Sequence, residues 1–400
     1  LDINGEAAFL VDQTSGRILY EKNAHKKLYP ASTTKIMTAI LAIEYGKMDE
    51  MVLIDDEIVG LTDGSHIALD RKEKVKFEDL LNALLIASAN DSAMALGKHI
   101  AGSLEGFTDM MNAKAKELGA VNTHFANAHG LHDDKHYTTA YDLYLITSYA
   151  MENELFREIV KKTHYTIAPT NVKDEERLMH TTNKFLYGNS KIYLDNQLIP
   201  IKYEGMSGIK TGYTPEAGNC LVSYASRDGR NIYSVVLKSQ GNEVYADTMR
   251  LMDFAFTGFT TSIIANANEF VDNIDVKNGT LPFVSAILDQ DIYYTLAMEE
   301  TSAIEKKILL NEEVIAPISK GDSLGVVEYY LAGEKVAESN LVSTMSVDLI
   351  PAAKLKDVLL SKWYLFVFGL WFVFRLIVLF NKRIRRKKGR ASYYRYDSVK

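Results

Sequence analysis

The chain has 400 residues, of which 47% are hydrophobic and 24% are charged, and its formal net charge is −7. This length suits two domains, and the composition is that of a folded protein. Residues 382–400 contain nine Lys or Arg and one Asp, so the preceding body is acidic, which argues against nucleic acid as a partner. The lone Cys220 excludes an internal disulfide framework and a thiolate metal cluster.

The first predicted elements are a hairpin and a buried helix. Residues 7–12 and 17–20 are predicted strands, and the turn residues Gln13-Thr14-Ser15-Gly16 join them. After Pro30, the apolar residues from Ile36 to Ile43 predict a helix that is buried on most sides. Free backbone N–H groups and the helix dipole at its N-terminus favour developing negative charge.

Ser32 and Lys35 stand at the start of this helix. Positions three apart lie on one helix face, so the Ser32 hydroxyl and the Lys35 amine can touch. A serine becomes a good nucleophile when a base takes its proton, and a lysine with a lowered pKa can be that base. The same spacing recurs at Ser207 and Lys210, but there it approaches a strand, on which such residues cannot converge.

Helices are predicted to fill the middle of the first domain. They cover residues 77–87, 93–100, 107–118 and 139–151, with a break at residues 88–90. The intervening loop contains His129, His132 and His136. These histidines share no helix face and lack a second ligand cluster, so we expect no metal site there.

Strands return towards the end of this domain. Residues 205–212, 219–226 and 231–238 are predicted antiparallel neighbours, and residues 247–256 a closing helix. Together with the hairpin they predict an α+β fold for residues 1–258, with one sheet built from both ends and a helical insert. Short alternating runs with turn signals predict a small β-rich domain at 262–352, including strands at 292–296 and 335–337.

The C-terminal part is predicted to meet a membrane. Residues 363–380 are apolar except for Arg375, and about 18 helical residues cover about 27 Å, close to the thickness of a hydrocarbon core. We therefore expect a transmembrane anchor at 359–380 and a basic tail at 381–400. The positive-inside rule places the tail in the cytoplasm and the rest outside. Arg375 must snorkel or find a partner, and a helix lying on the membrane surface is the alternative.

Two further motifs complete a candidate catalytic set. Ser88-Ala89-Asn90 places a hydroxyl and an amide at a break between helices, and Lys210-Thr211-Gly212 lies on a strand, where glycine lets a ligand backbone approach closely. Each occurs once in the chain. The order S-x-x-K, S-x-N, K-T-G is typical of penicillin-binding proteins and class A β-lactamases.

The segments around these motifs resemble the low-molecular-mass penicillin-binding proteins of the D-alanyl-D-alanine carboxypeptidase type. The resemblance rests on residues 30–35, 127–137 and 208–213, and the β-domain and C-terminal anchor are also similar. It implies a β-lactamase/transpeptidase-like catalytic domain and no cofactor. Family anchors are often amphipathic, whereas this one is apolar all round. Some members carry an arginine downstream of K-T-G that helps to hold the substrate carboxylate, and residues 240–247 have none.

The resemblance also implies the reaction. Ser32 attacks the carbonyl between two D-alanines of a peptidoglycan stem peptide, Lys35 takes its proton, and the acyl-enzyme is hydrolysed. The backbone N–H groups of Ser32 and Tyr213 form the oxyanion hole. β-Lactams would inhibit by acylating the same serine.

The remaining roles follow from the other two motifs. Ser88 relays a proton to the leaving amine, and Asn90 positions the peptide. Lys210 and Thr211, next to Gly212, face the terminal carboxylate, and the charge of Lys210 helps to keep Lys35 neutral.

Two alternatives stay open. A β-lactamase needs a dedicated deacylating carboxylate, which only the composition of residues 152–156 suggests. A membrane-tethered wall or β-lactam sensor could keep Ser32 and Lys35 and still be acylated, so turnover separates it from a carboxypeptidase.

Overall fold

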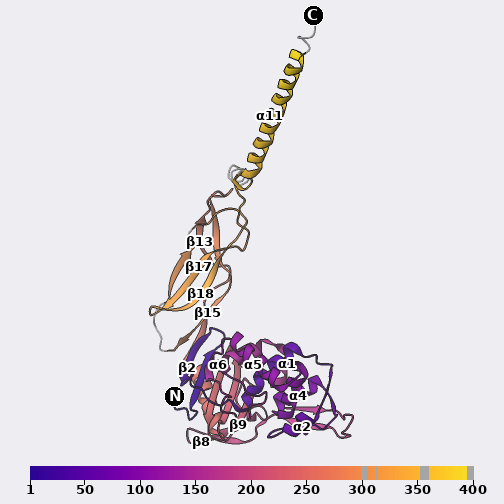
Figure 1. The fold of residues 1–400 in the computed structure, drawn as a ribbon. Helices are drawn as coiled ribbons and strands as arrows, with labels where there is room; N and C mark the ends of the chain where they lie inside the picture. Colours follow the sequence, from indigo (N-terminus) through magenta and orange to yellow (C-terminus); the bar gives the residue numbers. More distant parts are fainter. Residues whose placement is uncertain (299–303, 312, 352–359, 394–400) are drawn as a thin grey trace, which may run out of the picture. The chain divides into compact units, whose positions relative to one another are not determined.

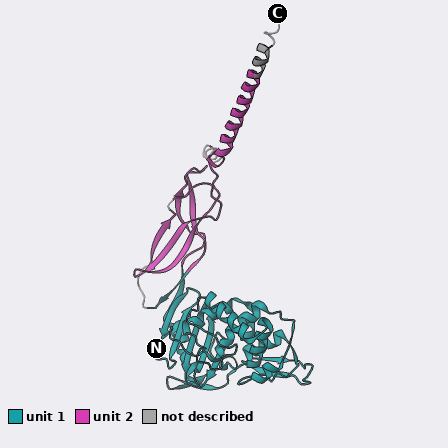
Figure 2. Cartoon of the chain, viewed as in Figure 1, with its two compact units in different colours: residues 1–263, 293–301 teal, residues 264–292, 302–400 magenta. Residues whose placement is uncertain are grey.

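A computed structural model describes residues 1–298, 304–311, 313–351 and 360–393, with side chains as far as Arg385. The chain forms two compact units, which Figure 2 colours separately. The first comprises Leu1–Ile263 and Tyr293–Thr301, and the second Ile264–Ile292 and Ser302–Lys400. Residues 352–359, which include the first residue of the predicted anchor, and residues 394–400 of the predicted tail lie outside the described residues.

The first unit contains a sheet and a group of helices (Figure 1). The sheet is antiparallel and has five strands in the order β2-β1-β11-β10-β9. The strands are β1 (Ala7–Asp12), β2 (Arg17–Lys22), β9 (Met206–Thr214), β10 (Gly218–Arg227) and β11 (Arg230–Ser239). The N-terminal hairpin therefore pairs with strands more than 200 residues later. The predicted α+β fold, with a sheet from both ends of the domain, is confirmed.

Two hydrophobic cores cover the two faces of this sheet. In β1, alternate residues point to opposite sides. Phe9 and Val11 join the larger core beneath the helices, and Ala8 and Leu10 join a smaller core with α9 (Glu243–Gly258). Helix α9 begins earlier than the predicted residue 247, with the acidic Glu243 in its first turn. A carboxylate there is favoured by the helix dipole.

The helical insert packs on the side of the larger core. Its helices are α1 (Lys35–Tyr45), α2 (Asp56–Leu61), α3 (Phe77–Ile86), α4 (Asn90–Ala101), α5 (Leu104–Glu117), α6 (Ala140–Glu152) and α7 (Glu154–Val160). Helix α1 is buried from Lys35 to Ala42 and packs against several of the others, as its apolar sequence predicts. Helix α4 begins at Asn90, earlier than predicted, so Asn90 belongs to a rigid first turn.

Short elements complete the first unit. They are the two-stranded sheets β3 (Met51–Leu53) with β4 (Lys74–Lys76), β5 (His164–Ile167) with β6 (Arg177–His180), and β7 (Lys191–Leu194) with β8 (Gln197–Pro200), and the helix α8 (Lys184–Tyr187). Helix α8 contacts β9, the strand that carries K-T-G.

The second unit contains an antiparallel sheet in the order β13-β14-β18-β17-β16. Its strands are β13 (Phe270–Asp275), β14 (Phe283–Leu288), β16 (Ile304–Leu310), β17 (Ser323–Leu331) and β18 (Glu334–Ser343). A separate hydrophobic core lies against it. The predicted all-β domain is confirmed, although β18 is much longer than the strand predicted at 335–337.

One strand predicted for the β-domain has a different partner. β15 (Ile292–Ala297) pairs with β12 (Phe259–Ala265), and from Tyr293 onwards it belongs to the first unit. Hydrogen bonds to a buried carboxylate explain why β15 joins the first unit. Asp12 accepts them from Thr295 at 3.0 Å, Thr261 at 2.9 Å and the Arg230 guanidinium at 3.0 Å. A buried charge needs such partners, and Thr295 supplies one of them.

The C-terminal segment forms α11 (Trp363–Tyr393), which continues past the predicted end at residue 380 into the basic residues. Among the described residues it is the one helix long and apolar enough to cross a membrane, over Trp363–Arg385 with a mean hydropathy of 2.1. The Arg375 guanidinium lies 5.2 Å from the centre of the Trp371 ring, which gives it a cation–π partner on its own helix.

Candidate active site

Ser32 and Lys35 meet as their spacing predicts. Ser32 lies in a 3₁₀ turn, Ala31–Thr34, rather than at the start of the α-helix, which begins at Lys35. Residues three apart eclipse each other in a 3₁₀ turn. The Nζ atom of Lys35 accordingly lies 2.9 Å from Ser32 Oγ. Ala31 has a φ of +47°, a strained conformation of the kind that clusters at functional sites.

Lys35 is enclosed by acceptors. Its side chain is 0% exposed, and Nζ lies 2.6 Å from Asn90 Oδ1 and 2.7 Å from the His129 carbonyl oxygen. Burial lowers the pKa of Lys35 well below its usual value, and the charge of Lys210 lowers it further. A neutral amine has two N–H groups and one lone pair. When the N–H groups bind Asn90 and His129, the lone pair remains for the Ser32 proton.

Ser88 and Lys210 form a second pair beside the first. Ser88 lies between α3 and α4 with a φ of +59°, and its Oγ is 2.9 Å from Lys210 Nζ. Lys210 lies on β9, is 1% exposed, and also donates to the Thr211 carbonyl oxygen at 3.0 Å. Burial lowers the pKa of Lys210 to about 7. Burial therefore shifts both lysines towards the neutral form.

Asn90 holds its surroundings in place with both ends of its amide. Its oxygen accepts from Lys35, and its Nδ2 donates to the Asp63 carbonyl oxygen at 2.6 Å. Its backbone N–H donates to the Ser65 carbonyl oxygen at 2.6 Å, which fixes the loop before β4. Asn90 thus positions Lys35 through its side chain and Ser65, which lines the cleft, through its backbone.

The K-T-G strand runs directly beside the serine. A Cβ atom on Gly212 would lie 3.0 Å from both Pro30 O and Ser32 N, tighter than nine in ten Cβ contacts. Glycine at this position therefore lets β9 approach the serine turn itself. Thr211 Oγ1 lies 2.6 Å from Thr182 Oγ1, and Tyr213 is 62% exposed.

These residues line one cleft of about 380 Å³. Among the predicted site residues, Ser32, Ser88, Thr211, Gly212 and Tyr213 face it, whereas Lys35, Asn90 and Lys210 are buried behind it. The cleft is also lined by residues that sequence reasoning did not find, including Thr182, Lys184, Asn242 and Tyr245. They come from α8, α9 and the adjoining loops, which carry no catalytic motif.

The histidine loop supports the serine–lysine pair. His129 supplies its carbonyl oxygen to Lys35. His136 is 2% exposed and contacts Thr34 Oγ1 through Nε2 at 2.7 Å, while its Nδ1 accepts from the Ala126 N–H. Burial lowers the pKa of both imidazoles to about 3. Within the described residues, no group of three His, Cys, Asp or Glu side chains is placed to hold a metal ion.

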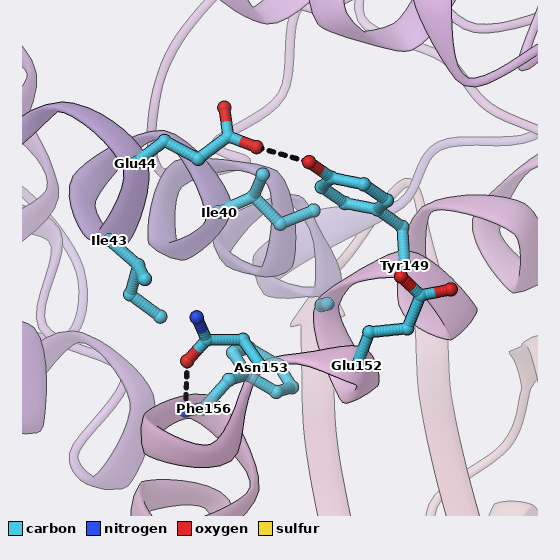
Figure 3. Close-up of a pocket in the computed structure, with 8 residues that line it drawn as sticks. Ile40, Ile43, Glu44, Tyr149, Glu152, Asn153 and Phe156 are labelled. Atoms are coloured by element: carbon cyan, nitrogen blue, oxygen red, sulfur yellow. Dashed lines mark hydrogen bonds between the residues drawn. The ribbon is translucent and has the colours of Figure 1, made fainter.

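A second cavity, of about 230 Å³, lies further along α1 (Figure 3). Ile40, Ile43 and Phe156 give it apolar walls, and the Tyr149 hydroxyl donates to Glu44 across it. Glu152, which composition had suggested for a β-lactamase, lies here and not in the cleft of the serine. This cavity contains none of the three motifs.

The sequence matches the family described as D-alanyl-D-alanine carboxypeptidase over residues 1–241. The chain belongs to this family. The family resemblance and the fold inferred from the motifs are confirmed. Residues 259–349 match the C-terminal domain of penicillin-binding protein 5, which agrees with the all-β sheet of the second unit.

Known proteins are similar to most of the chain. DacF of Bacillus subtilis is 34% identical over 341 residues, 84% of this chain and 83% of its own. Penicillin-binding protein 5 of Haemophilus influenzae has a TM-score of 0.73 at 26% identity, covering 87% of this chain and 98% of that one. PBP3 of Streptococcus pneumoniae has a TM-score of 0.72 at 26% identity, covering 87% of this chain and 100% of that one.

Proposed function

We propose that this chain is a serine-type D-alanyl-D-alanine carboxypeptidase that removes the terminal D-alanine from peptidoglycan stem peptides. The observation that carries the proposal is the 2.9 Å contact between Ser32 Oγ and a fully buried Lys35. Burial beside a second lysine favours the neutral amine, which is the form that accepts a proton. The names of the relatives, D-alanyl-D-alanine carboxypeptidases, support the choice of substrate.

Ser32 and Lys35 perform the bond-making step. Lys35 takes the hydroxyl proton as Ser32 Oγ attacks the carbonyl carbon between the two D-alanines. The leaving D-alanine amine takes a proton, for which Ser88 is the relay, since its Oγ bonds to Lys210. Water then attacks the ester, and Ser32 recovers its hydroxyl as the shortened peptide leaves.

The backbone stabilises the negative charge that develops on the carbonyl oxygen. We assign this role to the N–H groups of Ser32 and Tyr213. Gly212 lies close to the backbone nitrogen of Ser32, and this supports the assignment because it brings β9 next to the turn that contains Ser32. Thr211 lines the cleft, which supports its role towards the terminal carboxylate, and Lys210 next to it on β9 bonds to Ser88 Oγ.

The arrangement of acidic groups disfavours a β-lactamase. No Asp or Glu is among the described residues that line the cleft. Asp91, next to the S-x-N motif, is buried and accepts from the backbone N–H groups of Ile67, Leu69 and Ser92. It is occupied in holding the loop rather than placed to activate water.

Release of D-alanine tests the proposal directly. A soluble fragment ending at Pro351 should release free D-alanine from a peptide ending in D-Ala-D-Ala and leave an L-Ala-L-Ala ending intact. Penicillin should form a slow-clearing adduct. Rapid hydrolysis of penicillin without D-alanine release would indicate a β-lactamase, and stable acylation without peptide turnover a sensor.

We further propose that α11 anchors the chain in the cell membrane, with the catalytic domain outside and the basic tail in the cytoplasm. The apolar length of Trp363–Arg385 supports anchoring, and the basic residues after it support this orientation. We assign catalysis to residues 1–258 and an accessory role to residues 262–352. The segment 293–301, which completes the first unit, supports extending the catalytic part beyond residue 258.

A further inference from the structure

The substrate of the proposed reaction ends in a carboxylate, and the cleft must supply a positive charge for it. Lys210 is poorly suited to contact it directly. Its side chain is 1% exposed, and Nζ is already bound to Ser88 Oγ and the Thr211 carbonyl oxygen. Burial lowers its pKa to about 7, so part of its population is uncharged at neutral pH. The loop at 240–247 has no arginine to replace it.

Among the described residues that line the cleft, Lys184 is the one lysine. It begins α8, and Asn183 caps this helix by accepting from the Phe185 N–H at 3.0 Å. The neighbouring Thr182 bonds to Thr211 Oγ1 at 2.6 Å. The start of α8 is therefore tied to the K-T-G strand, and Lys184 is held close to it.

Contacts with α9 hold Lys184 from the other side. Its Nζ donates to Asn242 Oδ1 at 2.8 Å and lies 5.9 Å from the centre of the Tyr245 ring. Its backbone N–H donates to the Tyr245 hydroxyl at 3.3 Å, and Phe185 packs edge-on against the same ring. The ammonium group is thus positioned by neutral partners, and two of them, Asn242 and Tyr245, also line the cleft.

Among the described residues, no Asp or Glu oxygen lies within 4.0 Å of Lys184 Nζ, whereas lysines such as Lys26, Lys47 and Lys98 each have such a partner. Asn242 is also the N-cap of α9, where the helix dipole disfavours a cation. The Lys184 charge in the cleft is therefore held by an amide oxygen and a ring face, and no carboxylate within ion-pair distance neutralises it.

We propose that Lys184 is a specificity-determining residue that binds the C-terminal carboxylate of the substrate, together with Thr211. Its ammonium supplies the accessible charge, and the buried Lys210 acts on Ser88 and Lys35. The same site takes the carboxylate of penicillins. The inference about the peptide carboxylate rests on the proposed function. The inference about the penicillin carboxylate does not, because acylation by penicillin can be measured even if the peptide is not turned over.

The test compares ligands with and without the carboxylate. In the full-length protein, Lys184→Gln should lower the second-order rate of Ser32 acylation by a fluorescent penicillin about tenfold or more, the loss expected for a hydrogen bond to a charged group. Acylation by the methyl ester of that penicillin should change less than twofold. Lys184→Arg should keep most of the rate, and Lys191→Met, an exposed lysine on β7, should match the wild type.

Each outcome decides the proposal. Selective loss with the acid, restored by arginine, supports it. An equal loss with acid and ester would show that Lys184 only maintains the cleft, and an unchanged rate with the acid would show that it does not bind the carboxylate. If the wild type is acylated but releases no D-alanine, the proposed function is wrong. The role of Lys184 is then still decided by the acylation rates with the penicillin acid and its methyl ester.

Discussion

The Nε2 atom of His136 donates a hydrogen bond of 2.7 Å to Thr34 Oγ1, across 102 residues of sequence. The direction follows from the other ring nitrogen, because Nδ1 accepts from the Ala126 N–H. A neutral imidazole thus braces the turn that presents Ser32. Protonation would replace the acceptor at Nδ1 by a second donor and break this arrangement.

His136 should make the protein sensitive to acid. Its folded pKa is lowered to about 3, whereas an unfolded histidine has a pKa of about 6.5, so the unfolded state binds the proton first. The free energy of unfolding should therefore fall by up to about 1.4 kcal/mol per pH unit as the pH drops below 6.5. Urea unfolding at pH 7.5 and 5.0 should show a smaller decrease for His136→Gln than for the wild type. The exposed His180→Gln should behave as the wild type does; equal pH slopes for all three would contradict this account.

Lys210 should act in the opposite pH range. Its folded pKa of about 7 lies below the unfolded value of about 10.4, so between these values the unfolded state holds a proton that the folded state has released. Wild-type stability should consequently rise with pH across this window, and Lys210→Met should lack that rise. The melting temperatures of Lys210→Met and the wild type should be measured at pH 7 and at pH 10. Relative to that of the variant, the melting temperature of the wild type should be higher at pH 10 than at pH 7. If the difference in melting temperature is the same at both pH values, burial does not lower the pKa of Lys210 in the folded state.

Ser32 should be the sole residue acylated by penicillin. Its hydroxyl contacts a buried lysine whose pKa is lowered, whereas Ser207 lies on β9 and Ser88 contacts Lys210. Peptide mapping by mass spectrometry should place the adduct on Ser32, and Ser32→Ala should abolish it. Ser207→Ala serves as the matched control and should be labelled like the wild type. An adduct on Ser207 or Ser88 would overturn the assignment of the nucleophile.

Lys35 should control the pH dependence of acylation. A protonated amine cannot accept the serine proton, so the rate should rise with pH as Lys35 becomes neutral, and this rise should be complete well below the usual lysine range. Lys35→Met should slow acylation about 100-fold or more, the usual contribution of a general base. Stopped-flow measurements over a wide pH range would show both effects. A rise confined to the usual lysine range would contradict the lowered pKa, and an unchanged rate for Lys35→Met would remove Lys35 from the role of base.

Helix α11 should behave as an integral anchor. Its apolar segment Trp363–Arg385 is long enough to span, and Arg375 stacks on Trp371 instead of standing alone. The full chain should stay with membranes after an alkaline carbonate wash, whereas a fragment ending at Pro351 should be recovered in solution. Release of the full chain by the wash would indicate a helix lying on the surface.

Local sequence was sufficient to predict the reacting pair. Ser32 and Lys35 are three residues apart, and both a 3₁₀ turn and an α-helix bring such positions together, so the contact did not depend on the type of helix. The apolar run at residues 7–12 and the turn residues after it likewise sufficed to predict the first hairpin. These features depend on neighbours in the chain or on regular periodicity.

Long-range polar contacts were beyond such reasoning. Lys184 lines the cleft because of contacts with Asn242 and Tyr245, and no motif surrounds it. The His129 carbonyl oxygen reaches Lys35 through a loop whose path has no periodic signal. Residues 292–296 have the pattern of a strand, but the hydrogen bond from Thr295 to Asp12 decides which sheet they join. The sequence pattern of a segment predicts whether it forms a helix or a strand more readily than it predicts which residues that helix or strand contacts.

The pairing of β1 with β11 also sets the order in which the enzyme can assemble. Ala7–Asp12 leaves the ribosome long before Arg230–Ser239, with which it pairs, and non-local pairings of this kind form late and slowly. Lys210 enters the site with the same late strands, and it contributes to the lowered pKa of Lys35. A nascent chain that already carries Ser32 and Lys35 therefore still lacks the K-T-G strand that passes beside Ser32, and the cleft is complete only after the last strands join the sheet.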